Sequence, residues 1–288
     1  MSKDIAITDV VLRDGLQDEP RTTSVEDRLA IAEALVAAGL DDIEAASFVN
    51  PKRVPQMSGA EDLGVVERMM PSVTWRALAL NRKGVERAVA AGFENINLVV
   101  SASTAHSRAN AGRTPPEAIA DLAEVVADHP QVKFSGGVAT AFVCPVEGEI
   151  SAETVVEIAE AYRRIGVGRI GLADTVGTAN PAAVQASLEQ LRERLPDIAV
   201  SLHLHNAEGQ AFETVDRALD LGVTEFDAAT GGYGGCPFAP GAHGNIATED
   251  LVAHLTERGI DTGVDLDGLV EVRRLITEAL ARGHPVAA

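Results

Sequence analysis

The sequence is poor in cysteine and in aromatic residues, and both shortages narrow the class of protein. Only two of its 288 residues are cysteines, Cys144 and Cys236. We therefore expect no disulfide framework and a reduced, cytoplasmic setting. Aromatic residues make up 3% of the chain, against 46% for hydrophobic residues as a whole. Small aliphatic side chains must therefore fill the core, which suits helices packed on a parallel sheet.

Positive charge is also scarce, with 24 basic residues against 43 acidic ones and a formal net charge of -19. A chain this acidic repels nucleic acids and anionic membranes, so neither is an expected partner. An anionic substrate would need a local cation, either an arginine or a metal ion. No apolar run reaches membrane-spanning length, and residues 1–10 contain neither an apolar signal core nor an arginine-rich leader. We therefore expect a soluble intracellular protein.

Short apolar runs alternate with longer stretches of helical periodicity along the chain. Eight runs predict strands, at residues 5–12, 42–48, 75–80, 95–100, 132–143, 169–173, 200–205 and 225–228. Helices are predicted at 25–38, 61–70, 84–91, 115–127, 152–165, 181–195 and 210–221, with C-terminal extra helices at 246–255 and 266–281. Parallel strands need such crossover helices, and eight units favour a (β/α)₈ TIM barrel over an open doubly wound sheet. Because no linker divides the chain, we expect one domain over residues 1–288.

The seventh predicted strand ends in two histidines, and the active sites of barrels gather at the carboxyl ends of strands. His203 and His205 are two residues apart, so they point to the same face of a strand. Two inward-pointing imidazoles can bind one cation. A hydrogen-bonded pair of histidines without a metal fits this spacing equally well.

Charged residues lie in or after other predicted strands. Asp14 offers an oxygen to a metal and Arg13 can stabilise developing negative charge, although a plain surface turn is the alternative. Glu44 lies inside the second strand, where a carboxylate needs a partner, and we expect it to pair with Arg13 and orient it. Asp174, which ends the sixth strand region, is either a proton-transfer group or a helix N-cap.

A glycine-rich segment follows the eighth predicted strand, at residues 231–245. Glycine lets the backbone approach a ligand closely, and a disordered flap is the alternative interpretation. Within this segment we expect Cys236 to be a reactive thiol, although an isolated cysteine is more often an inert small hydrophobe. The amide oxygen of Asn245 is a suitable ligand for a hard cation.

Together these residues resemble the hydroxymethylglutaryl-CoA lyase branch of the DRE-type TIM-barrel metallolyases. The likeness covers nearly the whole chain and includes the segments 47–52, 54–57, 90–92, 144–148, 174–177 and 203–211. It begins at Arg13-Asp14-Gly15-Leu16-Gln17 and ends in the block that runs from Gly234-Gly235-Cys236-Pro237 to Ala247-Thr248-Glu249-Asp250. This final block is the most specific, because it separates the lyases from related Claisen-type synthases.

The resemblance implies both a metal site and a reaction. A Mg²⁺ or Mn²⁺ ion would be bound by Asp14, His203, His205 and Asn245. The catalytic residues would be Arg13, Glu44, Asp174 and Cys236. Arg13 would stabilise an enolate and Cys236 would transfer a proton. The implied partner is a small-molecule acyl-CoA substrate, 3-hydroxy-3-methylglutaryl-CoA, which would be cleaved to acetyl-CoA and acetoacetate by a homodimer.

Three departures from the family pattern leave the acyl group open. Asn206-Ala207-Glu208 stands where Asp-Thr-Tyr is usual, His243 stands where a small serine is typical, and residues 103–110 also differ. Citramalyl-CoA or a longer 3-hydroxy-3-alkylglutaryl-CoA is therefore an alternative substrate. A Claisen-type condensing enzyme and a non-catalytic acyl-CoA-binding barrel are further alternatives. The Cys236 segment argues against the first, and the full set of metal ligands argues against the second.

Overall fold

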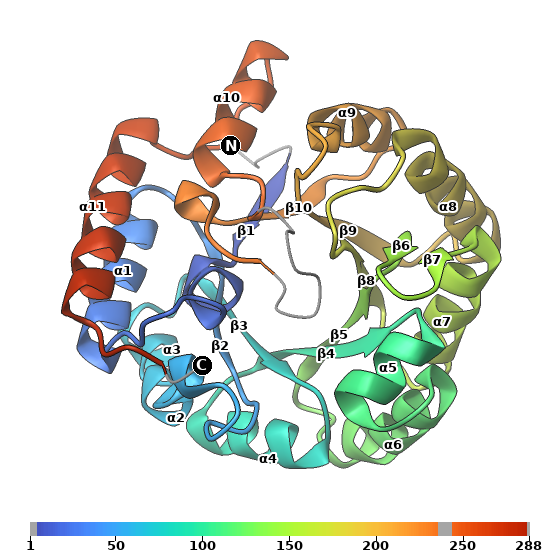
Figure 1. Ribbon diagram of the computed structural model, residues 1–288, viewed down its shortest axis with the longest axis horizontal. Coiled ribbons are helices and arrows are strands. Elements are labelled where there is room, and N and C mark those ends of the chain that lie inside the picture. The colour runs from blue at the N-terminus through green and yellow to red at the C-terminus, as the bar shows by residue number, and fades with distance from the viewer. Residues whose placement is uncertain (1–4, 236–243, 287–288) are drawn as a thin grey trace.

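The structure is a computed structural model that describes residues 5–235 and 244–286. Eight parallel strands close into a barrel in the order β1-β10-β9-β8-β5-β4-β3-β2, with helices around the outside (Figure 1). The strands are β1 (Ala6–Asp9), β2 (Asp42–Ser47), β3 (Thr74–Ala79), β4 (Asn95–Ser101), β5 (Lys133–Ala139), β8 (Arg169–Asp174), β9 (Ala199–Leu204) and β10 (Glu225–Ala228). The TIM barrel predicted from the sequence is confirmed.

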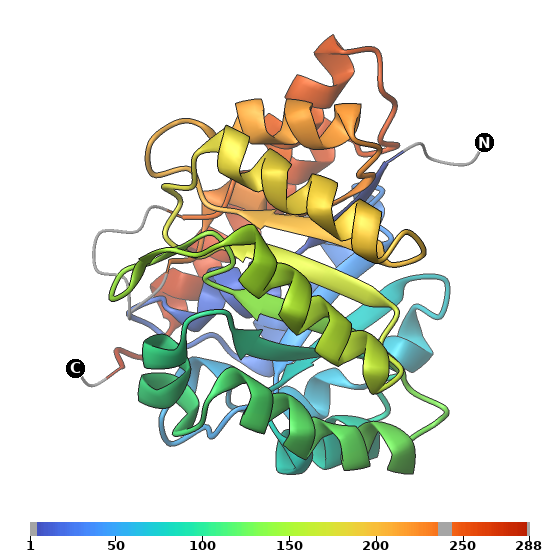
Figure 2. The same cartoon turned by 90° about the vertical axis from the view of Figure 1, so that its right-hand side faces the viewer.

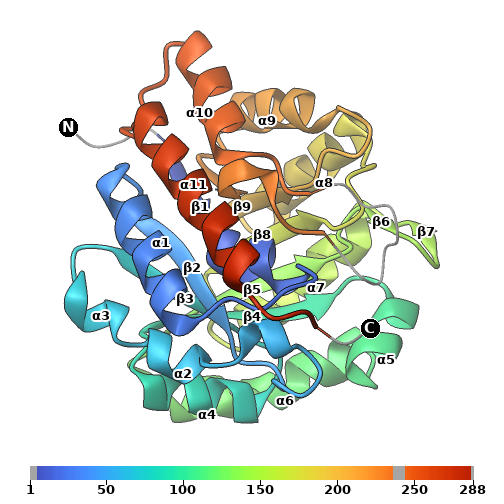
Figure 3. The same cartoon turned by 60° about the vertical axis from the view of Figure 1, so that its left-hand side comes forward.

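Most helices connect one barrel strand to the next and lie against the outer face of the sheet (Figure 2). They are α1 (Val25–Ala37), α2 (Ala60–Leu63), α3 (Val66–Met69), α4 (Arg82–Ala91), α5 (Thr104–Ala111), α6 (Pro115–Asp128), α7 (Ala152–Arg164), α8 (Pro181–Arg194) and α9 (Ala211–Asp220). The extra helices α10 (Thr248–Glu257) and α11 (Leu266–Arg282) follow the last strand, and α11 packs beside α1 (Figure 3). No helix in the described part of the chain is long and apolar enough to cross a membrane.

Close packing between helix and strand depends on glycine at particular positions. Tyr162 of α7 is fully buried, and its hydroxyl donates a hydrogen bond to the carbonyl oxygen of Leu98 at 2.6 Å. A Cβ atom at Gly136 of β5 would lie 2.8 Å from the Tyr162 ring, closer than side chains approach. The absence of a side chain at Gly136 therefore lets one of the few aromatic residues pack directly on the strand.

The predicted strand at residues 5–12 is too long, and the difference matters for the site. β1 ends at Asp9, and the chain then turns into a short π-helix, η1 (Val11–Gly15). The Asp9 carboxylate accepts a hydrogen bond from the backbone N–H of Val11 at 2.9 Å, so the Val11 N–H is not available to extend the strand pairing. The N–H groups of Arg13 and Asp14 both donate to the carbonyl oxygen of Val10. Arg13 and Asp14 therefore lie on a buried turn rather than directly at a strand end.

Two further predictions about secondary structure are wrong. The single helix predicted at 61–70 is split into α2 and α3 at Gly64, where a Cβ atom would lie 2.0 Å from the carbonyl oxygen of Ala91. The strand predicted at 132–143 ends at Ala139, because Thr140 adopts a φ of 50°, outside the strand region. Helix α5 and the hairpin of β6 (Val143–Cys144) and β7 (Gly148–Glu149) were not predicted.

Candidate active site

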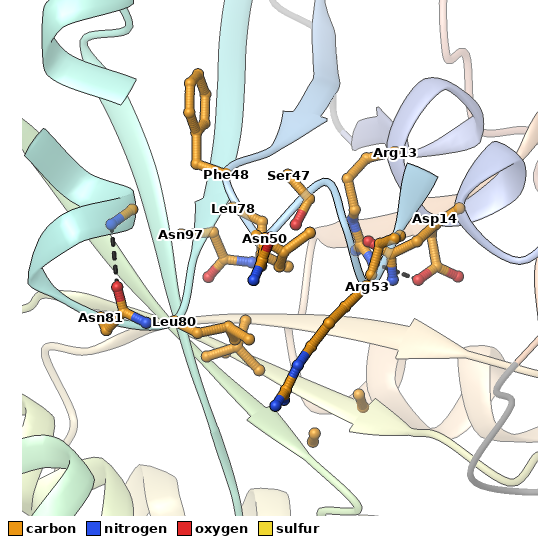
Figure 4. Close-up of a pocket in the computed structure, with 18 of the residues that line it drawn as sticks. Arg13, Asp14, Ser47, Phe48, Asn50, Arg53, Leu78, Leu80, Asn81 and Asn97 are labelled. Carbon is orange, nitrogen blue, oxygen red and sulfur yellow. Dashed lines mark hydrogen bonds and ion pairs between the residues drawn. The ribbon is translucent and has the colours of Figure 1, made fainter. Parts of the chain in front are cut away.

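The carboxyl ends of the barrel strands surround a cavity of about 1800 Å³. Arg13 and Asp14 approach it from η1, beside residues that follow β2 and β3 (Figure 4). His203 and His205 line the same cavity from β9 and the residue after it. Four of the residues singled out in the sequence thus share one site.

Asp14, His203 and His205 form a compact group of potential metal ligands. One ligand atom from each residue lies within 4.8 Å of the others. The two Nε2 atoms of the histidines are 3.2 Å apart, and Asp14 Oδ2 lies 3.8 Å from each of them. The spacing of two residues along β9 turns both imidazoles inward, as predicted. One carboxylate and two imidazoles are a donor set that divalent cations accept.

Asn245 completes this group from the other end of the chain. Its Nδ2 donates hydrogen bonds to Asp14 Oδ2 at 2.7 Å and to the carbonyl oxygen of Tyr233 at 2.9 Å. Its Oδ1 is buried and has no hydrogen-bond partner among residues 5–235 and 244–286. A buried amide oxygen without a partner is costly, and a cation bound there would satisfy it. The residues present therefore fit a divalent metal ion.

The charge state of Asp14 suits this role. Burial alone would raise the pKa of the Asp14 carboxyl group, but the nearby Arg13, His203 and His205 outweigh burial and hold the pKa well below its usual range. The carboxylate therefore stays ionised at any physiological pH and can bind a cation without first losing a proton.

Glu44 pairs with Arg13, as predicted. The Nε atom of Arg13 donates to Glu44 Oε2, and its Nη1 atom donates to Asp14 Oδ1. Asn97 Nδ2 donates to the other Glu44 oxygen at 3.4 Å. Arg13 and Glu44 are 8% and 2% exposed, so the guanidinium is held between two carboxylates with little access to water. Glu44 therefore orients Arg13 toward the cavity.

Asp174 stabilises the loop after β8. Its two carboxylate oxygens accept the backbone N–H groups of Gly177 and Ala179, each at 3.0 Å. The predicted helix N-cap role is wrong, because α8 begins later and is capped by the side chain of Asn180. Burial raises the pKa of Asp174, against the lowering effect of these hydrogen bonds. A catalytic role for Asp174 stays a prediction.

Cys236 and His243 lie outside the described residues. The structure does describe residues on either side of them, and one of these, Gly234, lies close to Asn245. Gly234 has a φ of +102°, and a Cβ atom there would lie 2.5 Å from Asn245 Nδ2 and 3.0 Å from Asp14 Oδ2. Glycine is therefore needed at position 234 both for the backbone conformation and for the space beside these two candidate ligands.

Sequence reasoning missed Asp227, which contacts one of the histidines. His203 Nδ1 lies 3.3 Å from Asp227 Oδ2, and the two residues are paired in register across β9 and β10. An Nδ1–H that points at this carboxylate leaves the lone pair of Nε2 directed at Asp14 and His205. The signal was present in the sequence, since Asp227, like Glu44, is an acidic residue inside a predicted strand.

We predict that Asp227→Asn weakens metal binding ten- to a hundredfold, because the amide no longer supplies the charge that supports the His203 tautomer. Titration calorimetry with Mn²⁺ measures the effect. Glu225→Gln is the matched control, since Glu225 lies two residues earlier on β10 and pairs with Arg169 instead. Equal affinities in wild type and Asp227→Asn would rule out this role.

Asp18 was also missed. It lines the cavity four residues after Asp14. Burial and the charge of Asp14 raise the pKa of its carboxyl group to about 7. The motif Arg13-Asp14-Gly15 does not indicate that Asp18 lines the cavity, because the position of Asp18 depends on the π-helical turn before it.

Comparison with known proteins gives one consistent result. The HMGL-like family model matches residues 4–276. An (R)-citramalyl-CoA lyase of Chloroflexus aurantiacus is 41% identical over 98% of this chain and 92% of its own length. A hydroxymethylglutaryl-CoA lyase of Bacillus subtilis is 36% identical over 98% of this chain and 95% of its own.

A solved structure agrees in fold. An HMG-CoA lyase from Acinetobacter baumannii, in complex with coenzyme A and 3-methylmalate, superposes with a TM-score of 0.91 and 39% identity. The match covers 99% of this chain and 95% of that one. The chain therefore belongs to the HMGL-like family. It is a carbon–carbon lyase, like these relatives.

Proposed function

We propose that the protein cleaves 3-hydroxy-3-methylglutaryl-CoA to acetyl-CoA and acetoacetate with the help of a bound Mg²⁺ or Mn²⁺ ion. The observation that carries this proposal is the group of Asp14, His203 and His205, which share one cavity with Arg13. Beside Asp14 lies Asn245, whose buried Oδ1 has no hydrogen-bond partner among the described residues. Metal ligands beside a buried arginine are the parts that a retro-aldol cleavage of a thioester needs.

The four ligands would hold the ion at the mouth of the barrel. Such an ion, when bound, lowers the pKa of a substrate hydroxyl group and polarises it. Carboxylate, amide and imidazole donors suit Mn²⁺, and the two oxygen donors also suit Mg²⁺. The ionised Asp14 is available for binding, and Asp227 beside His203 Nδ1 favours a proton on that nitrogen, which would leave Nε2 for the ion.

Arg13 acts on the other half of the substrate. When the 3-hydroxyl group loses its proton, the bond between C2 and C3 breaks and the bonding electrons pass to the acetyl-CoA enolate. The guanidinium, held by Glu44 and Asp14, stabilises that negative charge by charge-assisted hydrogen bonds. A proton added to the α-carbon then gives acetyl-CoA, and we propose the thiol of Cys236 as its source.

The charge of the cavity supports an acyl-CoA substrate. In a chain with a net charge of -19, the described residues that line the cavity include seven lysines or arginines and only five acidic residues. Arg53, in the turn after β2, extends into this space (Figure 4). The local excess of positive charge favours entry of an anionic thioester such as one that carries the phosphates of coenzyme A.

A second candidate substrate is citramalyl-CoA, which would give acetyl-CoA and pyruvate. The 41% identity to the (R)-citramalyl-CoA lyase favours it. The 3-methylmalate in the related solved structure is an isomer of citramalate with the same four-carbon diacid backbone, which is consistent with this choice. Both thioesters have a methylated tertiary alcohol β to the thioester carbonyl, so the same residues would serve either cleavage.

The homodimer implied by the family resemblance is part of the proposal.

An assay of acetyl-CoA release tests the function. We expect the wild-type protein to release acetyl-CoA from 3-hydroxy-3-methylglutaryl-CoA, EDTA to abolish release, and added Mn²⁺ or Mg²⁺ to restore it. Cys236→Ala is expected to fold normally and to lose most of the turnover. Release that ignores the chelator contradicts the metal site. Turnover of citramalyl-CoA alone contradicts only the choice of substrate.

A further inference from the structure

Asp9 is a buried carboxylate that the proposed reaction does not use. It is fully buried at the end of β1, and it does not line the cavity in the described part of the chain. Its Oδ1 accepts the N–H of Val11 at 2.9 Å. Its Oδ2 accepts the N–H of Thr230 at 3.1 Å and the hydroxyl groups of Thr230 and Thr248, each at 2.7 Å. Four donors around one buried carboxylate form an unusually complete set of partners.

These partners belong to the two segments, far apart in the sequence, that carry two of the four proposed metal ligands, Asp14 and Asn245. Val11 is the first residue of η1, which bears Asp14. Thr230 and Thr248 lie on either side of the segment that bears Asn245. The base of that segment is also closed by backbone hydrogen bonds, from Ala229 N to Ile246 O at 3.1 Å and from Thr248 N to Ala229 O at 3.2 Å.

Asp9 therefore holds both segments at one point. Its Oδ1 holds the start of η1, and its Oδ2 holds both sides of the Asn245 segment. Beyond this point the segments meet again at the hydrogen bond from Asn245 Nδ2 to Asp14 Oδ2. That bond turns Asn245 Oδ1 away from Asp14, and Oδ1 has no hydrogen-bond partner in the part of the chain that the structure describes. Asp9 thus touches neither Asp14 nor Asn245 but contacts both of the segments that carry them.

We propose that Asp9 is a positioning residue, which fixes Asn245 relative to Asp14 through the hydroxyl groups of Thr230 and Thr248. The inference rests on the proposed metal site and adds a determinant of its affinity. A ligand pair fixed before the metal arrives loses less conformational entropy on binding, so loss of the two hydroxyl contacts lowers affinity even when all four ligands remain.

The direct change, Asp9→Asn, leaves four donors facing an amide group and is expected to lower the melting temperature as well as metal affinity. The sharper variant is the double substitution Thr230→Val/Thr248→Val, which keeps the shape of both side chains and removes both hydroxyl donors. Its matched control is Thr230→Ser/Thr248→Ser, which removes the methyl group of each threonine and keeps both hydroxyl donors.

Two measurements on these proteins decide the matter. Titration with Mn²⁺ is expected to show affinity at least tenfold weaker in the valine variant and within about threefold of wild type in the serine variant. Hydrogen exchange in the metal-free protein is expected to speed up at residues 11–16 and 244–247 in the valine variant only. The melting temperatures of both variants report general loss of stability.

The outcomes separate this inference from the proposed function. If the wild-type protein binds no Mn²⁺, the proposed metal site is wrong. If wild type binds Mn²⁺ and the valine variant binds it equally well, the metal site stands and Asp9 has no positioning role. Equal losses of affinity in the valine and serine variants also overturn the inference, because packing rather than the hydroxyl contacts would then set the affinity.

Discussion

Replacement of Arg13 by methionine is expected to lower kcat by at least a hundredfold. The guanidinium is the buried cation next to the proposed metal ligands, and loss of one preorganised donor to a developing oxyanion costs about a hundred- to a thousandfold in rate. Affinity for Mn²⁺ should change less than kcat, since Arg13 supplies no ligand atom. Steady-state kinetics on the thioester and a metal titration measure the two effects separately.

The same change also affects stability, which the controls must take into account. Among the described residues, Arg13→Met leaves the buried Glu44 with the amide of Asn97 as its remaining side-chain hydrogen-bond partner. An uncompensated buried charge costs about 3–5 kcal/mol. The double variant Arg13→Met/Glu44→Gln removes that charge and should recover much of the melting temperature but not the turnover. Arg13→Lys keeps the charge and loses the fixed geometry of the guanidinium, so its kcat should fall between those of wild type and Arg13→Met. A kcat near wild type in Arg13→Met would refute the enolate role.

Replacement of His205 by alanine is expected to weaken Mn²⁺ binding by more than a hundredfold. The substitution removes a proposed ligand, whose Nε2 lies 3.2 Å from that of His203 and 3.8 Å from Asp14 Oδ2. The effect should exceed the ten- to hundredfold losses typical of residues that only support a ligand. Titration calorimetry gives the affinity, and saturating Mn²⁺ should restore little activity.

His254→Ala is the matched control for this experiment. His254 lies on α10, where its Nε2 contacts Asp216 at 2.6 Å on the outer helical layer, and it does not line the cavity. Its loss should leave the affinity for Mn²⁺ unchanged. If His205→Ala binds Mn²⁺ as tightly as the control does, the two histidines are a hydrogen-bonded pair and not metal ligands.

The sequence predicted those parts of the site that local patterns determine. The spacing of His203 and His205 is a property of any strand, so both side chains were expected to face inward before the barrel was known. An acidic residue inside a strand needs a partner, and Glu44 has the one predicted for it, Arg13. Eight alternating units also sufficed for the barrel itself.

The remaining parts depend on contacts between distant segments. The register that pairs Asp227 with His203 follows from the order of strands in the closed barrel, which alternation of apolar and polar residues does not specify. The turn that buries Arg13 and Asp14 exists because Asp9 binds a backbone N–H that a strand would otherwise use. An acidic residue inside a predicted strand indicates that Asp227 needs a partner, but the local sequence does not identify that partner, and it does not indicate the turn after Asp9.

Asp14 and Asn245 are 231 residues apart in the sequence, and their side chains are joined by a hydrogen bond in the fold. They lie after the first and the last barrel strands, which pair to close the ring. During synthesis the proposed site thus stays incomplete until Asn245 has left the ribosome, long after Asp14. Because an ion that binds only the closed form stabilises it by mass action, metal uptake favours ring closure over partly assembled, open-ended sheets.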